Sequence, residues 1–175
     1  MRILLTLIFA LSVTACSTKA PEGIEPVSEF DVSRYLGKWY EIARLDHRFE
    51  RGLTQVSADY QLRESGGIRV LNRGYSADED AWQEAEGKAF FVSDETIGHL
   101  KVSFFGPFYG AYVIFELDHD DYQYAYIAGP NRDYLWFLSR SPKVSEAQIE
   151  HFVATAKAAG FDTEALIFVE QDAQP

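Results

Sequence analysis

Cysteine is almost absent from this chain. Cys16 is the only cysteine among 175 residues, so no disulfide can form within the chain. A fold without disulfides depends on its hydrophobic core and its hydrogen bonds, even when the protein is exported to a compartment where disulfides form. The chain therefore needs enough length to bury a substantial core.

Basic side chains are also scarce. The chain has 16 lysines and arginines against 27 aspartates and glutamates, which gives a formal net charge of −11 at pH 7. A surface with this excess of negative charge repels nucleic acids and anionic lipid head groups. The composition excludes a nucleic-acid-binding protein and a protein held on a membrane by a basic patch.

Motifs of catalysis and metal binding are missing as well. The sequence has no Gly-x-Ser-x-Gly motif, which presents the nucleophile of many hydrolases, and no glycine-rich cofactor loop. None of the four histidines has the sequence spacing of a metal site: His47, His99, His119 and His151. The sequence therefore predicts no enzyme, no metal and no cofactor.

Long hydrophobic runs are limited to the first residues. The run from Ile3 to Val13 follows Arg2 and gives way to small residues before Cys16, which is the layout of a secretory signal peptide. The run is well short of the roughly 20 apolar residues that a membrane-spanning helix needs. The sequence Val-Thr-Ala-Cys at 13–16 resembles the bacterial lipoprotein box. That resemblance implies a diacylglycerol on the Cys16 thiol, cleavage just before it and acylation of the new amino group; the alternative is that Cys16 is an ordinary small residue.

Cleavage before Cys16 removes the signal peptide 1–15 and leaves 160 residues with a net charge of −12, enough for one domain. Several acyl chains together anchor a protein stably. Ser17 stands where an aspartate retains enteric-type lipoproteins in the inner membrane, so the resemblance implies the outer membrane, with the domain facing the periplasm. Residues 16–29, with two prolines and a glycine among polar neighbours, predict a flexible or extended tether ahead of a domain at 30–175.

Alternating polarity dominates the region from Trp39 to Arg140. Short runs in which every second residue is apolar are separated by clusters of Gly, Asp, Asn and Pro, a pattern typical of an antiparallel β meander. In the first of these strands, strict alternation places four residues on one face: Trp39, Glu41, Ala43 and Leu45.

The later runs, at 109–117, 122–128 and 134–139, are apolar on both faces and need cover on both sides. A helix can supply the outer cover, because Ser145 and Gln148 fit a capping box and a helical apolar face follows before Gly160. A short strand is expected at 165–169. Since the eight main strands show no edge protection, they are most simply closed into a barrel. The predicted fold is all-β, an eight-stranded antiparallel up-and-down barrel with one C-terminal α-helix on the outside.

A Gly-x-Trp motif on the first strand and an arginine at the end of the last strand then carry a family resemblance. Gly37, Trp39 and Arg140 occupy these positions, together with longer matching strings at 39–44, 46–53, 101–110 and 133–136. The chain thus resembles the lipocalins, and within them the bacterial outer-membrane group. The resemblance implies a ligand-binding barrel whose closed end has Arg140 packed over Trp39. The family's middle motif is matched less well, because Leu117 replaces its usual threonine.

A barrel of eight strands holds either a packed interior or one small ligand. Small residues at several inward positions favour a cavity. If the first strand rises from the closed end, alternation in direction places the mouth at the turns near 46–54, 75–81, 105–110 and 129–133. The candidate ligand-binding residues are the inward ones nearest this mouth: Val56, Ala58, Asn72, Ala85, Gly87, Phe104, Tyr112, Ile114, Ile127, Tyr134 and Trp136. For each aromatic residue in this set, plain core packing is the alternative.

Two glutamates, Glu41 and Glu116, also face inward by alternation, and a buried carboxylate must be paired, hydrogen-bonded or protonated. Arg140 is expected to pair with one of them near the closed end. At the mouth, Phe105 and Phe108 share one turn and should expose apolar surface unless lipid, membrane or a second copy covers it. A homodimer is one open possibility.

These features predict an acylated lipoprotein that stores or moves fatty acids or lysophospholipids, for envelope maintenance under stress. An apolar cavity with a few hydroxyl and amide groups suits an acyl chain whose head group stays near the opening. The alternative is a periplasmic lipoprotein carrier or chaperone whose client is an acylated protein.

Overall fold

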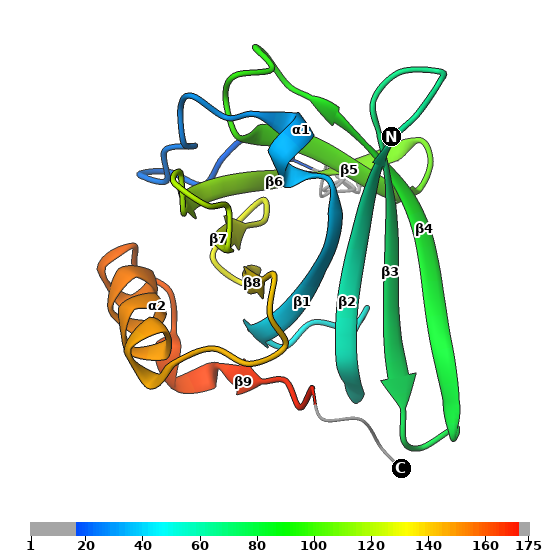
Figure 1. The fold of residues 1–175 in the computed structure, drawn as a ribbon, viewed down its shortest axis with the longest axis vertical. Helices are drawn as coiled ribbons and strands as arrows, with labels where there is room; N and C mark the ends of the chain where they lie inside the picture. The colour runs from blue at the N-terminus through cyan, green and yellow to red at the C-terminus, as the bar shows by residue number, and fades with distance from the viewer. Residues whose placement is uncertain (1–16, 172–175) are drawn as a thin grey trace, which may run out of the picture.

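The structure is a computed structural model and describes residues 17–171; the predicted signal peptide and Cys16 lie outside the described residues. Within that range the chain forms one antiparallel sheet of nine strands (Figure 1). The strands are β1 (Gly37–Arg44), β2 (Leu53–Leu62), β3 (Ile68–Ser76), β4 (Ala81–Phe91), β5 (His99–Phe105), β6 (Phe108–Leu117), β7 (Tyr124–Ala128), β8 (Leu135–Ser139) and β9 (Ile167–Phe168). Each of the first eight pairs with its neighbours in sequence, and β1 pairs with both β8 and β2. The predicted closed barrel of eight strands is therefore confirmed, with β9 added beside the end of β1.

Helix α2 (Glu146–Ala158) covers the outside of the late strands, as the capping box predicts. The Ser145 hydroxyl accepts a hydrogen bond from the backbone N–H of Gln148 and so begins the helix. The Phe152 ring packs 4.9 Å from Tyr126 on β7 and 5.0 Å from Phe137 on β8, measured between ring centroids. Figure 1 shows α2 standing outside the barrel on the side of β7 and β8. Two short helices were not predicted, α1 (Val32–Tyr35) and the 3₁₀ turn η1 (Thr163–Ala165).

The structure has two hydrophobic cores, which explains why the late strands are apolar on both faces. Residues such as Ala125, Ile127 and Leu138 point into the barrel, where they join Trp39. Their neighbours in the same strands point outward and pack with α2: Tyr126, Ala128, Leu135 and Phe137. Alternate residues of one strand therefore pack in different cores, one inside the barrel and one between the barrel and α2.

Two β-bulges change which side chains face inward. In β1 the pairing with β8 shifts between Glu41 and Ala43, so Ala43 joins the outer core and Arg44 reaches Glu41 inside the barrel. The predicted alternation from Trp39 to Leu45 is therefore wrong beyond Glu41. In β6 the pairing shifts between Ile114 and Glu116. A bulge adds one unpaired residue and reverses the side-chain alternation after it.

The bulge in β6 corrects the prediction for Glu116. This residue pairs with Tyr126 of β7, whose side chain belongs to the outer core. Side chains directly opposite each other in a sheet lie on the same face. Glu116 therefore faces outward, toward Tyr124 and Tyr126, and not into the barrel.

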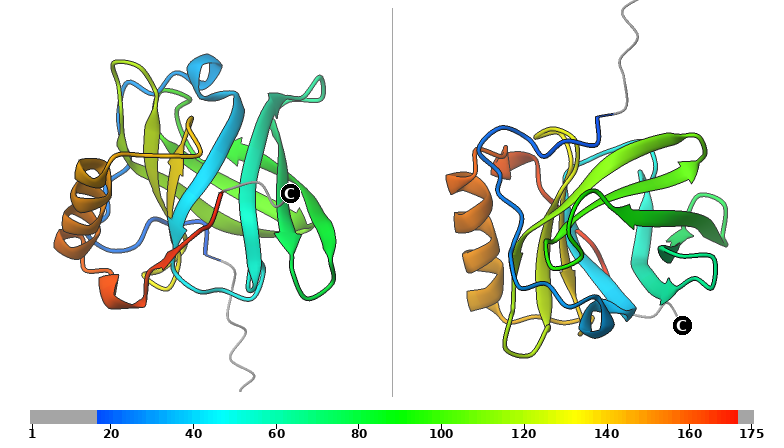
Figure 2. Two further views of the ribbon diagram at one scale, coloured as in Figure 1. Left: turned by 60° about the horizontal axis from the view of Figure 1, so that its bottom comes forward. Right: turned by 90° about the horizontal axis from the view of Figure 1, so that it is seen from above.

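Residues 17–30 are held against the barrel, whereas the sequence led us to expect a flexible tether over 16–29. The Val27 N–H donates to the carbonyl of Ile114, and the Val27 carbonyl accepts from Gly98. Ile24 is 4% exposed and belongs to the outer core. The right-hand view of Figure 2 shows this blue segment running along the outside of the barrel beside β6, on the side where α2 stands. The hydrogen-bond partners of this segment on the barrel lie some 65 to 110 residues away in sequence, so local composition could not reveal them.

The mouth of the barrel is splayed open. Among the described residues, Ala81 to Gly87 of β4 pair with β3 only, while β4 meets β5 from Lys88 onward. On the other side, β1 and β2 are paired from Gly37 to Tyr40 and then separate. These two separations widen one end of the barrel and leave space for the site described next.

Candidate ligand-binding cavity

Two adjoining spaces occupy the barrel. The inner space has a volume of about 90 Å³ and the outer space, which opens at the mouth, about 670 Å³. The larger volume lies within the range of roughly 300 to 1,000 Å³ that is usual for small-molecule sites. Both spaces border the same six residues: Glu50, Val56, Asn72, Val102, Phe104 and Trp136. The two spaces together form a passage from the mouth into the barrel.

Most of the predicted cavity residues border this passage. Val56, Asn72, Phe104 and Trp136 border both spaces, Ala58 and Tyr112 only the inner one, and Ala85 and Tyr134 only the outer one. Gly87 borders neither, because the Phe104 ring lies 2.8 Å from where a Cβ of Gly87 would stand. Ile114 and Ile127 also border neither, since both are 0% exposed within the inner core. Three of the four predicted turns contribute to the opening, which residues of 47–50, 105–110 and 130–134 line, whereas no residue of 75–81 borders either space.

Three tyrosine hydroxyls meet at the inner end of the passage. The Tyr112 hydroxyl lies 2.7 Å from that of Tyr35 and 2.8 Å from that of Tyr60. Two hydrogen bonds link three hydroxyl groups, so one of the three protons is not used within the cluster. Burial raises the pKa of all three phenols, which keeps them neutral. The cavity therefore has a neutral polar point at its deep end.

Of these tyrosines, only Tyr112 was a predicted cavity residue. Tyr60 shows the right alternation in β2, but it lies toward the closed end of the barrel. Tyr35 lies on α1, a short helix that the hydrophobic pattern of the sequence does not predict. Asp31 stands four residues before Tyr35, and its carboxylate accepts a hydrogen bond from the Ser33 N–H; this N-cap residue is the available sequence signal for the short helix.

A buried charged cluster lies on one side of the passage. Arg44 Nη1 donates to Glu41 Oε1 at 2.7 Å, and Arg44 Nη2 donates to the backbone carbonyl of Glu50 at 2.7 Å. Trp136 Nε1 donates to Glu50 Oε2 at 3.1 Å, and His47 Nε2 lies 3.0 Å from the same oxygen. Glu41 and Glu50 border the inner space, and their partners hold them in place.

The two carboxyl groups of this cluster differ in acidity. Burial, supported by the charge of Glu50, raises the pKa of Glu41 well above its ordinary value, although Arg44 opposes the rise. Burial would also raise the pKa of Glu50, but the hydrogen bond and charge of His47, with help from Trp136 and Arg44, more than offset it and lower that pKa. The cavity wall therefore combines one carboxyl group that favours its proton with one that favours ionisation.

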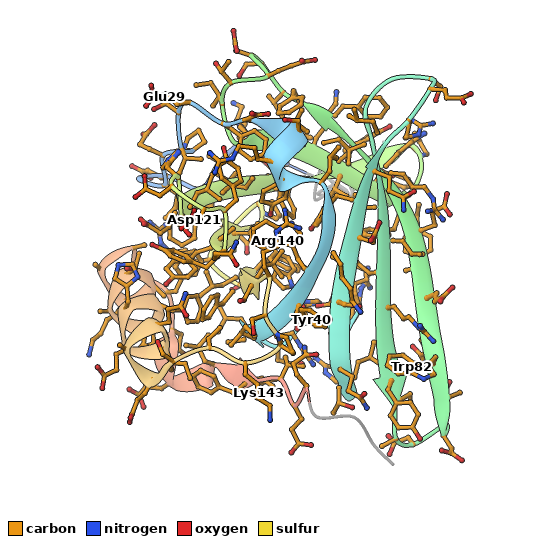
Figure 3. The ribbon with its side chains drawn as sticks, in the orientation of Figure 1. Glu29, Tyr40, Trp82, Asp121, Arg140 and Lys143 are labelled. Carbon is orange, nitrogen blue, oxygen red and sulfur yellow. The ribbon has the colours of Figure 1, made fainter. Side chains whose placement is uncertain are left out.

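The closed end is built as the resemblance implies, with one correction. The Arg140 guanidinium lies 3.9 Å from the centroid of the Trp39 ring, and Gly37 has a φ of +87°, which glycine adopts without strain. Arg140 pairs with neither Glu41 nor Glu116. It donates instead to the carbonyls of Lys38 at 2.9 Å and Arg34 at 2.7 Å, beside the start of β1 (Figure 3). Glu41 is too near the mouth for this contact, and its partner is Arg44.

Large apolar side chains are exposed around the mouth. Phe105 and Phe108, on the turn between β5 and β6, are 70% and 65% exposed, and Phe49 between β1 and β2 is 55% exposed. Trp82 is 45% exposed near the mouth end of β4 (Figure 3). Soluble monomers rarely expose clustered apolar surface without a function for it. Lipid, a membrane or a second copy would cover these residues.

A barrel closed by Arg140 over Trp39 and open to an apolar passage is a small-molecule-binding β-barrel, and the comparisons identify its family. A family model described as a lipocalin-like domain matches residues 30–171. The protein named Outer membrane lipoprotein Blc of Vibrio cholerae is 60% identical over 151 residues, which cover 86% of this chain and 88% of that protein. The protein of the same name from Escherichia coli K12 is 52% identical over 163 residues, 93% of this chain and 92% of that protein. Insecticyanin from the tobacco hornworm Manduca sexta has a similar fold, with a TM-score of 0.67 at 20% identity over 89% of this chain and 87% of that one.

The chain therefore belongs to the lipocalin family. Its identity to the two bacterial relatives places it among the outer-membrane lipoproteins of that family. Lipocalins of this kind are binding proteins and not enzymes. Within residues 17–171, no helix has both the length and the hydropathy to cross a membrane. The same residues contain no group of three His, Cys, Asp or Glu side chains placed to hold a metal ion.

Proposed function

We propose that this protein binds fatty acids or lysophospholipids in its barrel and stores or transports them at the periplasmic face of the outer membrane, in envelope maintenance under stress. The observation that carries the proposal is the pair of adjoining, mostly apolar spaces in the barrel, in which an outer space of about 670 Å³ at the mouth shares lining residues with a narrower inner space. This shape suits one acyl chain, and polar groups along its wall suit a head group. Acyl chains on Cys16 would supply the membrane anchor.

The wall of the passage supports a ligand with one long apolar part. Val56, Val102 and Phe104 line the junction of the two spaces. The buried charged groups of the cavity, Arg44, Glu41, Glu50 and His47, contact one another, so none of these four demands a highly charged ligand. The exposed Arg48 at the opening can meet a phosphate or carboxylate without desolvation of the arginine.

Native mass spectrometry of a chain that begins at Ser17, after incubation with a mixed lipid extract, tests this function. We expect one single-chain lipid per barrel. The variant Trp136→Arg, which places a charge at the junction of the two spaces, should lose the lipid, whereas Leu62→Arg, at a side chain that is 63% exposed and borders neither space, should keep it.

Each outcome separates the proposed function from its alternative. Uptake of free lipid at fixed stoichiometry, with no protein partner present, counts against a carrier that recognises only acylated proteins. A barrel that stays empty with every lipid of the extract would contradict lipid storage. The same spectra report whether the protein is a monomer or the homodimer that the exposed mouth leaves open.

A further inference from the structure

The first described residue lies beside the mouth of the barrel. The Ser17 carbonyl accepts a hydrogen bond of 3.0 Å from the backbone N–H of Ala111. Ala111 borders the outer cavity and lies in β6, three residues from Phe108. At a rise of about 3.4 Å per residue, Ser17 is about 10 Å along the strand from the exposed tip of the β5–β6 turn. Cys16 is the next residue toward the N-terminus and adds one Cα–Cα step of about 3.8 Å.

The segment that follows Ser17 is fixed to the barrel by contacts at several of its residues. The Thr18 carbonyl lies 2.9 Å from Nε2 of His99 on β5, and Arg132 Nη2 donates to the Glu22 carbonyl at 2.7 Å. Ile24 is buried, and Val27 exchanges hydrogen bonds with the barrel. The chain is thus fastened from its first described residue onward, and a group attached to Cys16 cannot move far from the mouth.

The two ends of the barrel present different surfaces. The mouth exposes Phe49, Phe105 and Phe108, and its aromatic residues alternate with cations: the Arg48 guanidinium lies 5.2 Å from the Phe49 ring and the Lys101 ammonium 5.4 Å from the Tyr109 ring. The turns of the closed end expose Leu62 and Val92 but, among the described residues, no phenylalanine, and they expose acidic residues: Glu64, Asp94, Glu95, Asp120 and Asp121. Aromatic rings beside basic side chains suit the boundary between lipid and water, whereas carboxylates do not.

From these observations we propose that the barrel stands on the membrane with its mouth against the lipid, Phe105 and Phe108 inserted among the head groups and the cavity open to the leaflet that holds the Cys16 acyl chains. This proposal rests on the acylation of Cys16 in the proposed function. It commits the exposed aromatic turn to a lipid surface and not to a second copy of the chain. A ligand would then pass between leaflet and cavity without crossing water.

The strand length and the net charge of the protein indicate how deeply the mouth enters the membrane and which lipids it contacts. An interfacial helix buries its apolar face about 5 to 10 Å into the head-group region, and the strand from Ala111 to Phe108 is about 10 Å long, so Phe108 can enter that region while Ser17 stays at its edge. The mature net charge of −12 disfavours an anionic surface, and an acidic turn at 78–80 lies between β3 and β4. Vesicles of zwitterionic phosphatidylcholine are therefore the probe of choice.

Nitroxide labels on the acylated protein in phosphatidylcholine vesicles test this orientation. Cys16 is the only cysteine and its thiol is acylated in the proposed form, so an introduced cysteine is the only thiol that a spin label can reach. Phe108→Cys places the label at the mouth, and Leu62→Cys is the matched control at an exposed apolar residue of the closed end. Both side chains are more than 60% exposed, and neither substitution removes a buried contact.

We expect the label at position 108 to be relaxed by oxygen, which concentrates in the bilayer, and protected several-fold from a water-soluble nickel complex relative to the label at 62. Equal nickel access at both positions, or protection at 62 alone, would overturn the proposal. Spin–spin broadening at 108 that disappears on dilution with unlabelled protein would assign the turn to a second copy, which also overturns it. If Phe108→Cys does not fold, Phe105→Cys on the same turn replaces it.

Two further measurements on the same samples separate this inference from the proposed function. Intact mass shows whether Cys16 carries acyl groups, and a chain without them would overturn the anchor together with the orientation. Lipid extracted from the barrel shows whether the cavity is used. A protected label on an empty barrel would support the orientation and contradict lipid storage, whereas a loaded barrel with a water-exposed label would do the reverse.

Discussion

At the scale of single residues, the cavity wall brings its buried charged groups together but leaves some buried polar atoms of the described residues without a hydrogen-bond partner, among them Asn72 Oδ1 and Ser103 Oγ. Arg44 donates hydrogen bonds to the Glu41 carboxyl group and to two backbone carbonyls. The Glu50 carboxylate accepts a hydrogen bond from Trp136 and lies beside His47 Nε2. Buried charges of this kind cost free energy unless they are paired. The pairing leaves a wall that is polar but nearly neutral, which suits a mostly apolar ligand.

Glu41→Gln tests the electrostatics of this wall. A carboxyl group whose pKa is raised by folding contributes stability that is fully present below its unfolded pKa, near 4.3, and is lost as the pH rises through its folded pKa. Each unit by which folding raises a pKa corresponds to about 1.4 kcal/mol of unfolding free energy. The free energy of unfolding should therefore fall less between pH 5 and pH 8 in Glu41→Gln than in the wild type.

Urea unfolding at the two pH values measures this difference. Glu50 does not contribute to this difference between pH 5 and pH 8. Folding lowers the pKa of Glu50, so its contribution to stability is lost only when the pH falls below the pKa of the unfolded state and through that of the folded state. Glu150→Gln, at an exposed site on α2, is the control and should follow the wild type. Identical pH dependence in all three proteins would show that Glu41 titrates normally.

At the scale of elements, α2 and the late strands depend on each other. The apolar outer faces of β7 and β8 need cover, and α2 supplies it through Phe152 and Ala156, both 0% exposed. The N-terminal segment covers a further part of the same core through Ile24. The outer core thus joins both ends of the chain to the barrel wall.

Phe152→Ala should destabilise the protein by about 3 to 5 kcal/mol, because it removes a fully buried ring and leaves a cavity against Tyr126 and Phe137. Glu150→Ala, on the exposed face of the same helix, should change stability by less than about 0.5 kcal/mol. Urea denaturation of the two variants is the measurement. A loss in Phe152→Ala as small as that of the control would mean that α2 contributes little to the fold.

At the scale of the whole molecule, the cavity and the exposed aromatic residues lie at the same end of the barrel. The wide cavity and the exposed aromatic turn are both at the mouth, where strand pairing is interrupted. The opposite end is closed by Arg140 over Trp39 and by α1. A ligand that fills the mouth binds the folded state only, and it should stabilise the molecule as a whole.

A fatty acid at 100 times its dissociation constant should add about 2.7 kcal/mol to the free energy of unfolding, which raises the melting temperature by about 5 to 10 °C for a chain of this size. Ala85→Trp places a large ring in the outer cavity and should abolish the shift. Ala77→Trp, at an exposed residue that borders neither space, should keep it. Thermal melts followed by circular dichroism measure these shifts, and an equal shift in both variants would place the ligand outside the barrel.

The sequence by itself determined the main strands, the outer helix α2 and the contact of Arg140 with Trp39 at the closed end, but not the short helix α1 beside that contact. Alternation along β2 to β5, the capping residue Ser145 and the Gly37-x-Trp39 motif are local signals, because each depends on neighbours within a few residues. Only the tertiary structure decided that Arg44 turns inward, that Glu116 turns outward and that residues 17–30 lie on the barrel. A bulge reverses alternation without a local sequence signal, and the contacts of Ser17 and Val27 join residues some 70 to 90 positions apart.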